Sequence, residues 1–190
     1  INMGCPMTKV VRNGDGAALM QNVPLAARIV EAVAKAGSVP VTVKCRLGWD
    51  RGNLCVVELA QAVASAGAQA IAVHGRTRAM LYSGVADWDT IRQVKQAVAI
   101  PVIANGDIFS GEAAVQCQKR SAADFLMLGR GVFGDPWLFQ EVNAALEGRP
   151  IPPRPPLAAR MDTALEQLHL ARQDKGEHIA CLEARKHFAW

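Results

Sequence analysis

Short apolar runs recur along the chain, and loops that contain glycine follow them. The runs span residues 41–46, 70–74, 102–105 and 125–128, and a shorter stub occupies residues 1–3. Apolar side chains on successive positions are typical of parallel strands that are covered on both faces. We therefore predict a strand at each of these five places.

Segments with helical spacing separate the predicted strands. The first two span residues 24–36 and 54–66, and each ends at a glycine. Residues with N-cap or first-turn chemistry mark where the predicted helices begin; these are Pro24, Asn53, Asp87, Ser110 and Asp135. Alternating strands and helices favour either a (β/α)8 barrel or an open, doubly wound sheet.

The length of the chain bears on the choice between these architectures. A complete barrel needs about 250 residues, whereas this sequence has 190. We expect an α/β fold in which residues 1–148 form about the second half of a (β/α)8 TIM barrel, with the early strands missing. Residue 1 already has the character of a strand interior, which supports this interpretation.

The sequence changes character after residue 148. Residues 149–156 are rich in proline, which predicts an extended linker because proline fits neither a helix interior nor a central strand. Apolar residues at helical spacing return beyond the linker, and a second helical stretch starts at Ile179. We interpret residues 157–190 as the start of a small helical domain, and an extra helix packed on the barrel is the alternative.

Composition narrows the class of protein only slightly. The chain is 51% hydrophobic, and its formal net charge of +4 is compatible with a polyanionic partner but also common in proteins that bind none. No apolar run reaches the roughly 18–20 residues that cross a bilayer. The 5 cysteines, an odd number without CxxC pairs, argue against a disulfide framework and a structural zinc site. We therefore expect a protein of the reducing cytoplasm that binds neither a membrane nor a metal.

Polar residues gather where the predicted strands end, which is where α/β folds place their functional groups. They are Cys5, Lys44, Arg46, His74, Arg76, Asn105, Asp107 and Arg130. Gly129 and Gly131 flank Arg130, and the exposed backbone N–H groups of such a loop suit a phosphate. A tight glycine turn is the alternative at that loop, as an ordinary turn is for residues 105–107.

Several of these residues also have a structural alternative. Lys44 lies in an apolar strand, where an ammonium needs a bound anion, an electron-rich heterocycle or a buried salt bridge. His74 could donate a hydrogen bond to the same ligand or be a structural residue of the core. Cys5 could present its thiol to a cavity or pack as a small hydrophobic residue.

Taken together and in order, these segments resemble the tRNA-dihydrouridine synthases, most closely the bacterial B type. The resemblance rests on residues 1–6, 41–49, 73–77, 101–108, 128–131, 136–139 and 183–190. It implies an FMN-binding barrel followed by a helical domain that helps to hold tRNA. The implied reaction reduces selected uridines in tRNA to 5,6-dihydrouridine, with NADPH as the usual electron donor.

The resemblance also implies roles for individual residues. Cys5 would protonate C5 of uracil after hydride passes from the flavin to C6. Lys44 would contact the isoalloxazine near N1 and O2, with His74 beside it. The FMN phosphate would be held by Asn105, Gly106, Asp107, Gly129 and Arg130. The candidates for substrate contact are Asn2 and Arg76 on the uracil side, and Arg185 and Lys186 on tRNA.

Two other functions stay open at this level: an FMN barrel that acts on a free pyrimidine or another small molecule, and a tRNA-binding module without catalysis. The proline-rich linker and the basic tail argue against the first, and the joint presence of Cys5, Lys44 and His74 argues against the second.

We expect the full-length protein to be a monomer. Residues 1–190 expressed alone should hold FMN poorly, because open sheet edges would replace the missing strands.

Overall fold

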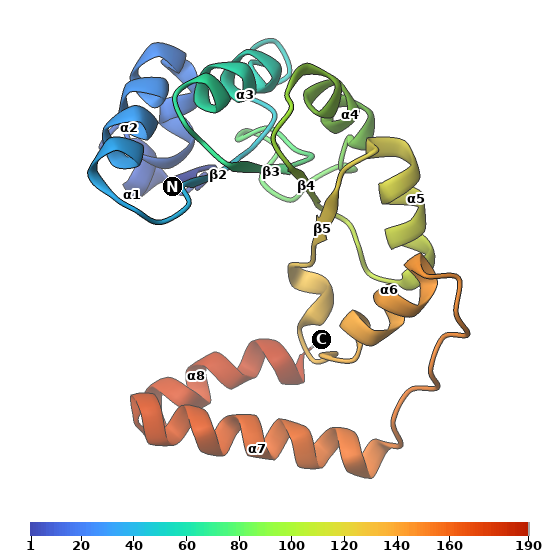
Figure 1. Ribbon diagram of the computed structural model, residues 1–190. Coiled ribbons are helices and arrows are strands. Elements are labelled where there is room, and N and C mark those ends of the chain that lie inside the picture. The colour runs from blue at the N-terminus through green and yellow to red at the C-terminus, as the bar shows by residue number, and fades with distance from the viewer. Residues whose placement is uncertain (190) are drawn as a thin grey trace. The chain divides into compact units, whose positions relative to one another are not determined.

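The part of the chain up to residue 127 is built around a sheet of parallel strands (Figure 1). The computed structural model describes residues 1–189, so the last residue of the predicted segment 183–190 lies outside the described part. The strands are β1 (Asn2–Met3), β2 (Thr42–Cys45), β3 (Ala70–His74), β4 (Val102–Asn105) and β5 (Phe125–Met127). All five predicted strands are confirmed, and their ends differ from the prediction by no more than one residue.

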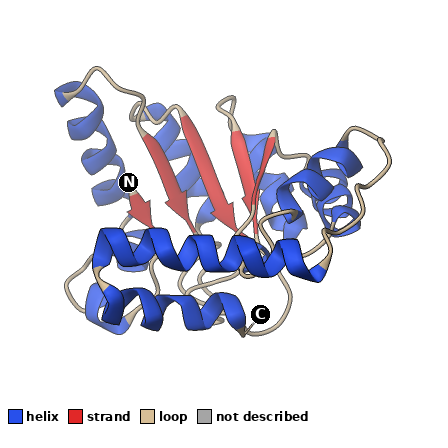
Figure 2. Cartoon of the chain, turned by 90° about the horizontal axis from the view of Figure 1, so that it is seen from below, coloured by secondary structure: helices blue, strands red, loops and turns tan. Residues whose placement is uncertain are grey.

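The strands lie across the sheet in the same order as in the sequence. Each pairs in parallel with the next, and their arrowheads point the same way in Figure 2. A doubly wound sheet reverses its strand order at a switch point, whereas a (β/α)8 barrel adds each strand beside the previous one. The predicted α/β class and partial barrel are therefore confirmed, and the doubly wound alternative is excluded.

Helices follow the strands along the chain. In order they are α1 (Thr8–Val11), α2 (Val23–Ala36), α3 (Val56–Ser65), α4 (Trp88–Ala97), α5 (Gly111–Ser121), α6 (Leu138–Leu146), α7 (Leu157–Lys175) and α8 (Glu177–Phe188). Two 3-10 helices, at Gly16–Gln21 and Arg130–Val132, complete the elements. Neither α1 nor the 3-10 helices were predicted, because segments this short carry no readable periodicity.

The two faces of the sheet differ in chemistry. On one face, Val43, Ile71, Val73 and Val102 are almost completely buried, and α2, α3 and α4 lie side by side along this region of the sheet (Figure 1). Each fully buried aliphatic side chain of this size stabilises the fold by about 1.5–3 kcal/mol. Because side chains alternate along a strand, Lys44 lies on the other face.

The predicted starts of two helices are confirmed. Asp87 caps α4, because its Oδ1 accepts hydrogen bonds from the backbone N–H groups of Asp89 and Thr90, both at 3.0 Å. α2 begins one residue before Pro24, and the side chain of Asn22 caps it by accepting from Leu25 N–H at 3.1 Å. A capping side chain of this kind stabilises a helix by roughly 1 kcal/mol.

Two predicted N-caps were wrong. Asn53 does not cap α3, which begins three residues later; its amide donates to Asp50 Oδ1 at 2.8 Å and its carbonyl accepts from Trp49 N–H, so it closes a turn instead. Asp135 does not cap α6, which begins at Leu138; its carboxylate pairs with Arg154 at 2.6 Å. In both places the polar side chain bonds to a residue outside the helix and not to the backbone at the start of the helix.

The chain divides into two compact units. One contains Ile1–Ile108 and Ala113–Met127, and the other contains Phe109–Glu112 with the chain from Leu128 onward. Residues 149–156 have no regular secondary structure, and α7 and α8 pack against each other beyond them. The predicted domain boundaries at residues 148 and 156 stay a prediction. Within residues 1–189, no helix is both long enough and apolar enough to cross a membrane.

Candidate functional site

The strand register brings most of the predicted site residues to one edge of the first unit. Asn2 on β1 lies beside Lys44 on β2, and His74 on β3 lies beside Asn105 on β4. Paired residues of parallel strands project to the same face of the sheet, so these four side chains share the face opposite the packed helices. Cys5 follows three residues after Asn2, at the carboxyl end of β1.

The turn that carries Cys5 is held on both sides of the cysteine. Asn2 Oδ1 accepts hydrogen bonds from the N–H groups of Gly4 at 2.9 Å and Cys5 at 3.1 Å. The Cys5 carbonyl accepts from Ala17 N–H at 3.0 Å. A Cβ on Gly16, whose φ is +58°, would lie 2.8 Å from the Cys5 carbonyl oxygen, so glycine is needed there. The half-buried thiol thus projects from a turn of defined shape.

Arg46 joins the loops that follow three strands. Its Nε donates to the Gly4 carbonyl at 3.0 Å, and its Nη1 donates to the carbonyls of Thr77 at 3.0 Å and Leu81 at 2.9 Å. The side chain is almost fully buried. Sequence reasoning noted Arg46 only as a polar residue at a strand end; its spacing of two from Lys44, which puts both on one face, was the signal that pointed to the site.

Lys44 is a half-buried cation on β2. Burial lowers its pKa to about 8, and the neighbouring charge of Arg46 also lowers it. Within residues 1–189, no carboxylate forms an ion pair with Lys44, so the predicted alternative of a buried salt bridge is not what holds it. An ammonium in this position favours a ligand that is anionic or electron-rich.

His74 is buried among cations. Burial, together with the charges of Arg46, Lys44 and Arg76, lowers its pKa to about 3. The imidazole is therefore neutral at physiological pH, so one ring nitrogen donates a hydrogen bond and the other accepts one. A neutral donor of this kind suits a polar heteroatom of a bound ring.

The buried His74 has a consequence for stability at acid pH. The unfolded chain takes up a proton on this histidine near pH 6.5, whereas the folded protein does so only near pH 3. Its contribution to the free energy of unfolding is therefore complete above pH 6.5 and falls as the pH decreases toward 3. We expect His74→Gln to flatten the stability profile over this range, measured by urea unfolding at stepped pH. An unchanged slope would contradict the buried, neutral imidazole.

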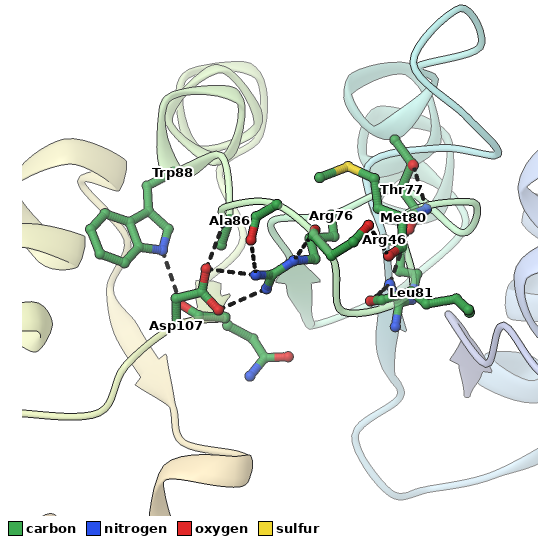
Figure 3. Close-up of polar contacts among 12 residues, drawn as sticks. Arg46, Arg76, Thr77, Met80, Leu81, Ala86, Trp88 and Asp107 are labelled. Carbon is green, nitrogen blue, oxygen red and sulfur yellow. Dashed lines mark hydrogen bonds and ion pairs between the residues drawn. The ribbon is translucent and has the colours of Figure 1, made fainter.

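Arg76 and Asp107 pair with each other (Figure 3). Arg76 Nη1 and Nη2 donate to the two carboxylate oxygens of Asp107, both at 2.8 Å, and Asp107 Oδ2 also accepts from Ala86 N–H at 2.7 Å. Arg76 donates further to the carbonyls of Ser83 at 3.0 Å and Gly84 at 2.7 Å. Any ligand of Arg76 would have to compete with these bonds, so its predicted contact with uracil stays a prediction.

The other predicted site residues belong to the second unit. Gly129 and Arg130 follow β5, and the Arg130 guanidinium lies 5.6 Å from the centre of the Phe109 ring. Arg185 and Lys186 are exposed in the last turn of α8, where Lys186 Nζ lies 5.7 Å from the centre of the Phe133 ring. The predicted phosphate and tRNA contacts of these residues stay predictions.

Cysteine and metal chemistry can be described for the part of the chain from residue 1 to 189. All five cysteines are free, and Cys45 and Cys117 are buried. No group of three or more His, Cys, Asp or Glu side chains comes close enough within this part to hold a metal ion. The reactive groups of the edge are therefore a thiol, an ammonium and an imidazole.

Comparison with known proteins shows to which family the chain belongs. The model of the dihydrouridine synthase family matches residues 1–190. The chain belongs to the dihydrouridine synthase family. The resemblance seen in the sequence is thereby confirmed, including its B type: the chain is 46% identical over 193 residues to tRNA-dihydrouridine synthase B of Pseudomonas aeruginosa and 44% identical over 190 residues to that of Vibrio cholerae.

The dihydrouridine synthase relatives are longer than this chain. All of the chain aligns with 57% of the Pseudomonas aeruginosa protein and with 59% of the Vibrio cholerae protein. A protein of Synechocystis sp. named "Probable tRNA-dihydrouridine synthase 1" is 46% identical over 190 residues, again covering 100% of the chain and 53% of the relative. The chain therefore spans a little more than half the length of these dihydrouridine synthases.

Proposed function

We propose that the chain is part of an FMN-dependent tRNA-dihydrouridine synthase, a cytoplasmic enzyme that reduces uridine in tRNA to 5,6-dihydrouridine with electrons from NADPH. One observation carries the proposal: Lys44, which is desolvated and has no carboxylate partner among residues 1–189, shares the carboxyl edge of the sheet with neutral His74 and with the Cys5 turn. Membership in the dihydrouridine synthase family supports it.

The residues of this edge fit FMN. Bound there, FMN would supply the hydride that is added to C6 of uracil. Lys44 would place positive charge beside N1 and O2, where the reduced isoalloxazine is electron-rich. His74 would hydrogen-bond the same ring as a neutral donor. Gly129 and Arg130 are proposed to hold the ribityl phosphate, because backbone N–H groups and a guanidinium suit that anion. Asn105 and Gly106 are proposed as further FMN contacts at the end of β4.

Cys5 is the proposed general acid. Addition of hydride at C6 leaves enolate character on C4 and C5, so a proton must reach C5. Transfer of the Cys5 thiol proton to that carbon completes the reduction and leaves a thiolate, which takes its next proton from solvent. The two hydrogen bonds that Asn2 Oδ1 accepts and the one that Ala17 N–H donates hold the turn so that the thiol can serve as a positioned acid.

Recognition of tRNA requires that the target uridine leaves its stack, because the ring must reach the edge of the sheet. Asn2 is proposed on the uracil side. Arg185 and Lys186 on α8 are proposed to contact the tRNA backbone, since both are exposed cations on one helical turn.

The test uses the full-length protein with unmodified tRNA and, separately, with free uridine. Dihydrouridine formed in tRNA with NADPH and FMN, at a kcat/KM at least about 10³ times that for free uridine, is the expected result, because most binding contacts lie outside the reacting base. Equal reduction of free uridine would favour the small-molecule oxidoreductase. Binding of tRNA without any reduction would favour a module that lacks catalysis.

A further inference from the structure

The turns after β3 and β4 are joined by a partly buried ion pair that lies against the proposed flavin site. We propose that the Arg76–Asp107 pair is a positioning device for His74, which holds the turn after β4 against the imidazole ring. The inference rests on the proposed function of the site. It assigns Arg76 and Asp107 to the orientation of a neighbouring residue in place of direct contact with uracil and phosphate.

The pair is built to hold a fixed geometry. It is bidentate, with both N–O distances at 2.8 Å, and Arg76 is only 2% exposed. Two parallel bonds between planar groups fix their relative orientation as well as their distance. Because Arg76 extends the strand that carries His74, and Asp107 follows the strand that carries Asn105, the pair ties together the ends of β3 and β4 (Figure 3).

Gly106 transmits this restraint to the imidazole. A Cβ built on Gly106 would lie 2.9 Å from His74 Cδ2, so the backbone of the turn packs directly on the ring. The Gly106 carbonyl accepts from Trp88 Nε1 at 3.0 Å, and the next residue, Asp107, has a φ of +56°. A non-glycine residue in the left-handed region is uncommon and persists where its surroundings hold it. The ion pair with Arg76 and the hydrogen bond from Ala86 N–H stabilise Asp107 in this conformation.

The direction in which the His74 pKa changes when Asp107 is replaced can show how Asp107 acts on the imidazole. Lys44 on β2, Arg46 directly after β2 and Arg76 after β3 lower the pKa of His74, whereas Asp107 after β4 raises it. If Asp107 acted on His74 through its charge alone, its neutralisation would lower the pKa further. If Asp107 acts by holding the turn, its loss admits water to the ring, and the pKa rises toward that of an exposed histidine.

The experiment measures the His74 pKa in the full-length protein by NMR of 13C-labelled histidine, in the FMN-free and FMN-loaded forms. Asp107→Asn removes the charge and keeps the shape, and Arg76→Lys keeps the charge but cannot form the bidentate pair. Asp124→Asn is the matched control, because Asp124 also pairs with a cation, Lys95 at 2.7 Å, and accepts a backbone N–H from Val102, but at the opposite end of the strands.

We expect the pKa of His74 to rise toward that of an exposed histidine in both site variants and to stay unchanged in Asp124→Asn. The FMN Kd should rise about tenfold in both, the size expected when a partner that orients a binding residue is lost. A pKa that falls or does not move in Asp107→Asn overturns the proposal. Circular dichroism establishes that each variant is folded, and Arg76→Lys alone decides the question should Asp107→Asn not fold. The His74 pKa is measured without tRNA, so this result does not depend on whether the protein reduces uridine. The proposed reaction is tested separately with tRNA.

Discussion

Cys5→Ala is expected to lower the rate of uridine reduction in tRNA by about 10²–10⁴-fold, the range that a positioned general acid contributes. Alanine keeps the turn, because the hydrogen bonds of residue 5 to Asn2 and Ala17 use only its backbone. FMN content and tRNA affinity should therefore be unchanged, and the loss should appear in kcat. Single-turnover reduction of tRNA by the NADPH-reduced enzyme measures the affected step directly.

The matched control for this variant is Cys181→Ala, which removes an exposed free thiol from α8. It should leave the single-turnover rate within experimental error of the unsubstituted protein. Cys5→Ser keeps a proton on a group that is a much weaker acid, so its rate should lie close to that of alanine. Undiminished dihydrouridine formation by Cys5→Ala would remove Cys5 from the role of proton donor.

Lys44→Met is expected to weaken FMN binding and, at the same time, to make the FMN-free protein more stable at neutral pH. The ammonium is desolvated, and its pKa of about 8 in the folded protein lies below the ordinary 10.5. This difference corresponds to roughly 3 kcal/mol of unfavourable free energy in the folded state below pH 8. Methionine fills a similar volume without the charge, so the cost disappears together with the contact to the flavin.

The pH dependence of stability provides the measurement for Lys44. Between about pH 8 and 10.5 the unfolded chain holds a proton on this lysine that the folded protein has released, so the free energy of unfolding rises with pH across this window. Urea unfolding of the FMN-free full-length protein should show that rise, and Lys44→Met should lack it. Lys35→Met, at an exposed lysine paired with Glu31, is the control. A lower stability of Lys44→Met at pH 7 would mean that the ammonium has a favourable partner in the protein.

The positions of the site residues at the carboxyl edge of the sheet could be predicted, because they depend on local sequence patterns. β2, β3 and β4 each consist of apolar residues followed by a loop that contains glycine, and parallel pairing aligns their ends. Lys44, His74 and Asn105 were therefore expected on one edge, where the structure has them. Their roles toward FMN rest on the family resemblance and stay proposals.

Contacts between loops that are distant in the chain could not be predicted from the sequence. The family resemblance assigned both Arg76 and Asp107 to ligands, and the sequence does not show that the two side chains meet. Their contact spans 31 residues and depends on the path of the loop between β3 and α4. The same holds for Arg46, whose partners are backbone carbonyls, because a carbonyl is present at every residue and gives no compositional signal.

By itself the sequence determined the alternation of strands and helices, the edge at which the polar residues gather, and the family. Local periodicity and ordered motifs carry that information, since each is written in consecutive residues. The tertiary structure alone decided which charges neutralise each other and which stay unpaired. Within residues 1–189 Lys44 has no carboxylate partner, and His74 is neutral, because burial and long-range packing set the free energy of each charge and no local pattern encodes them.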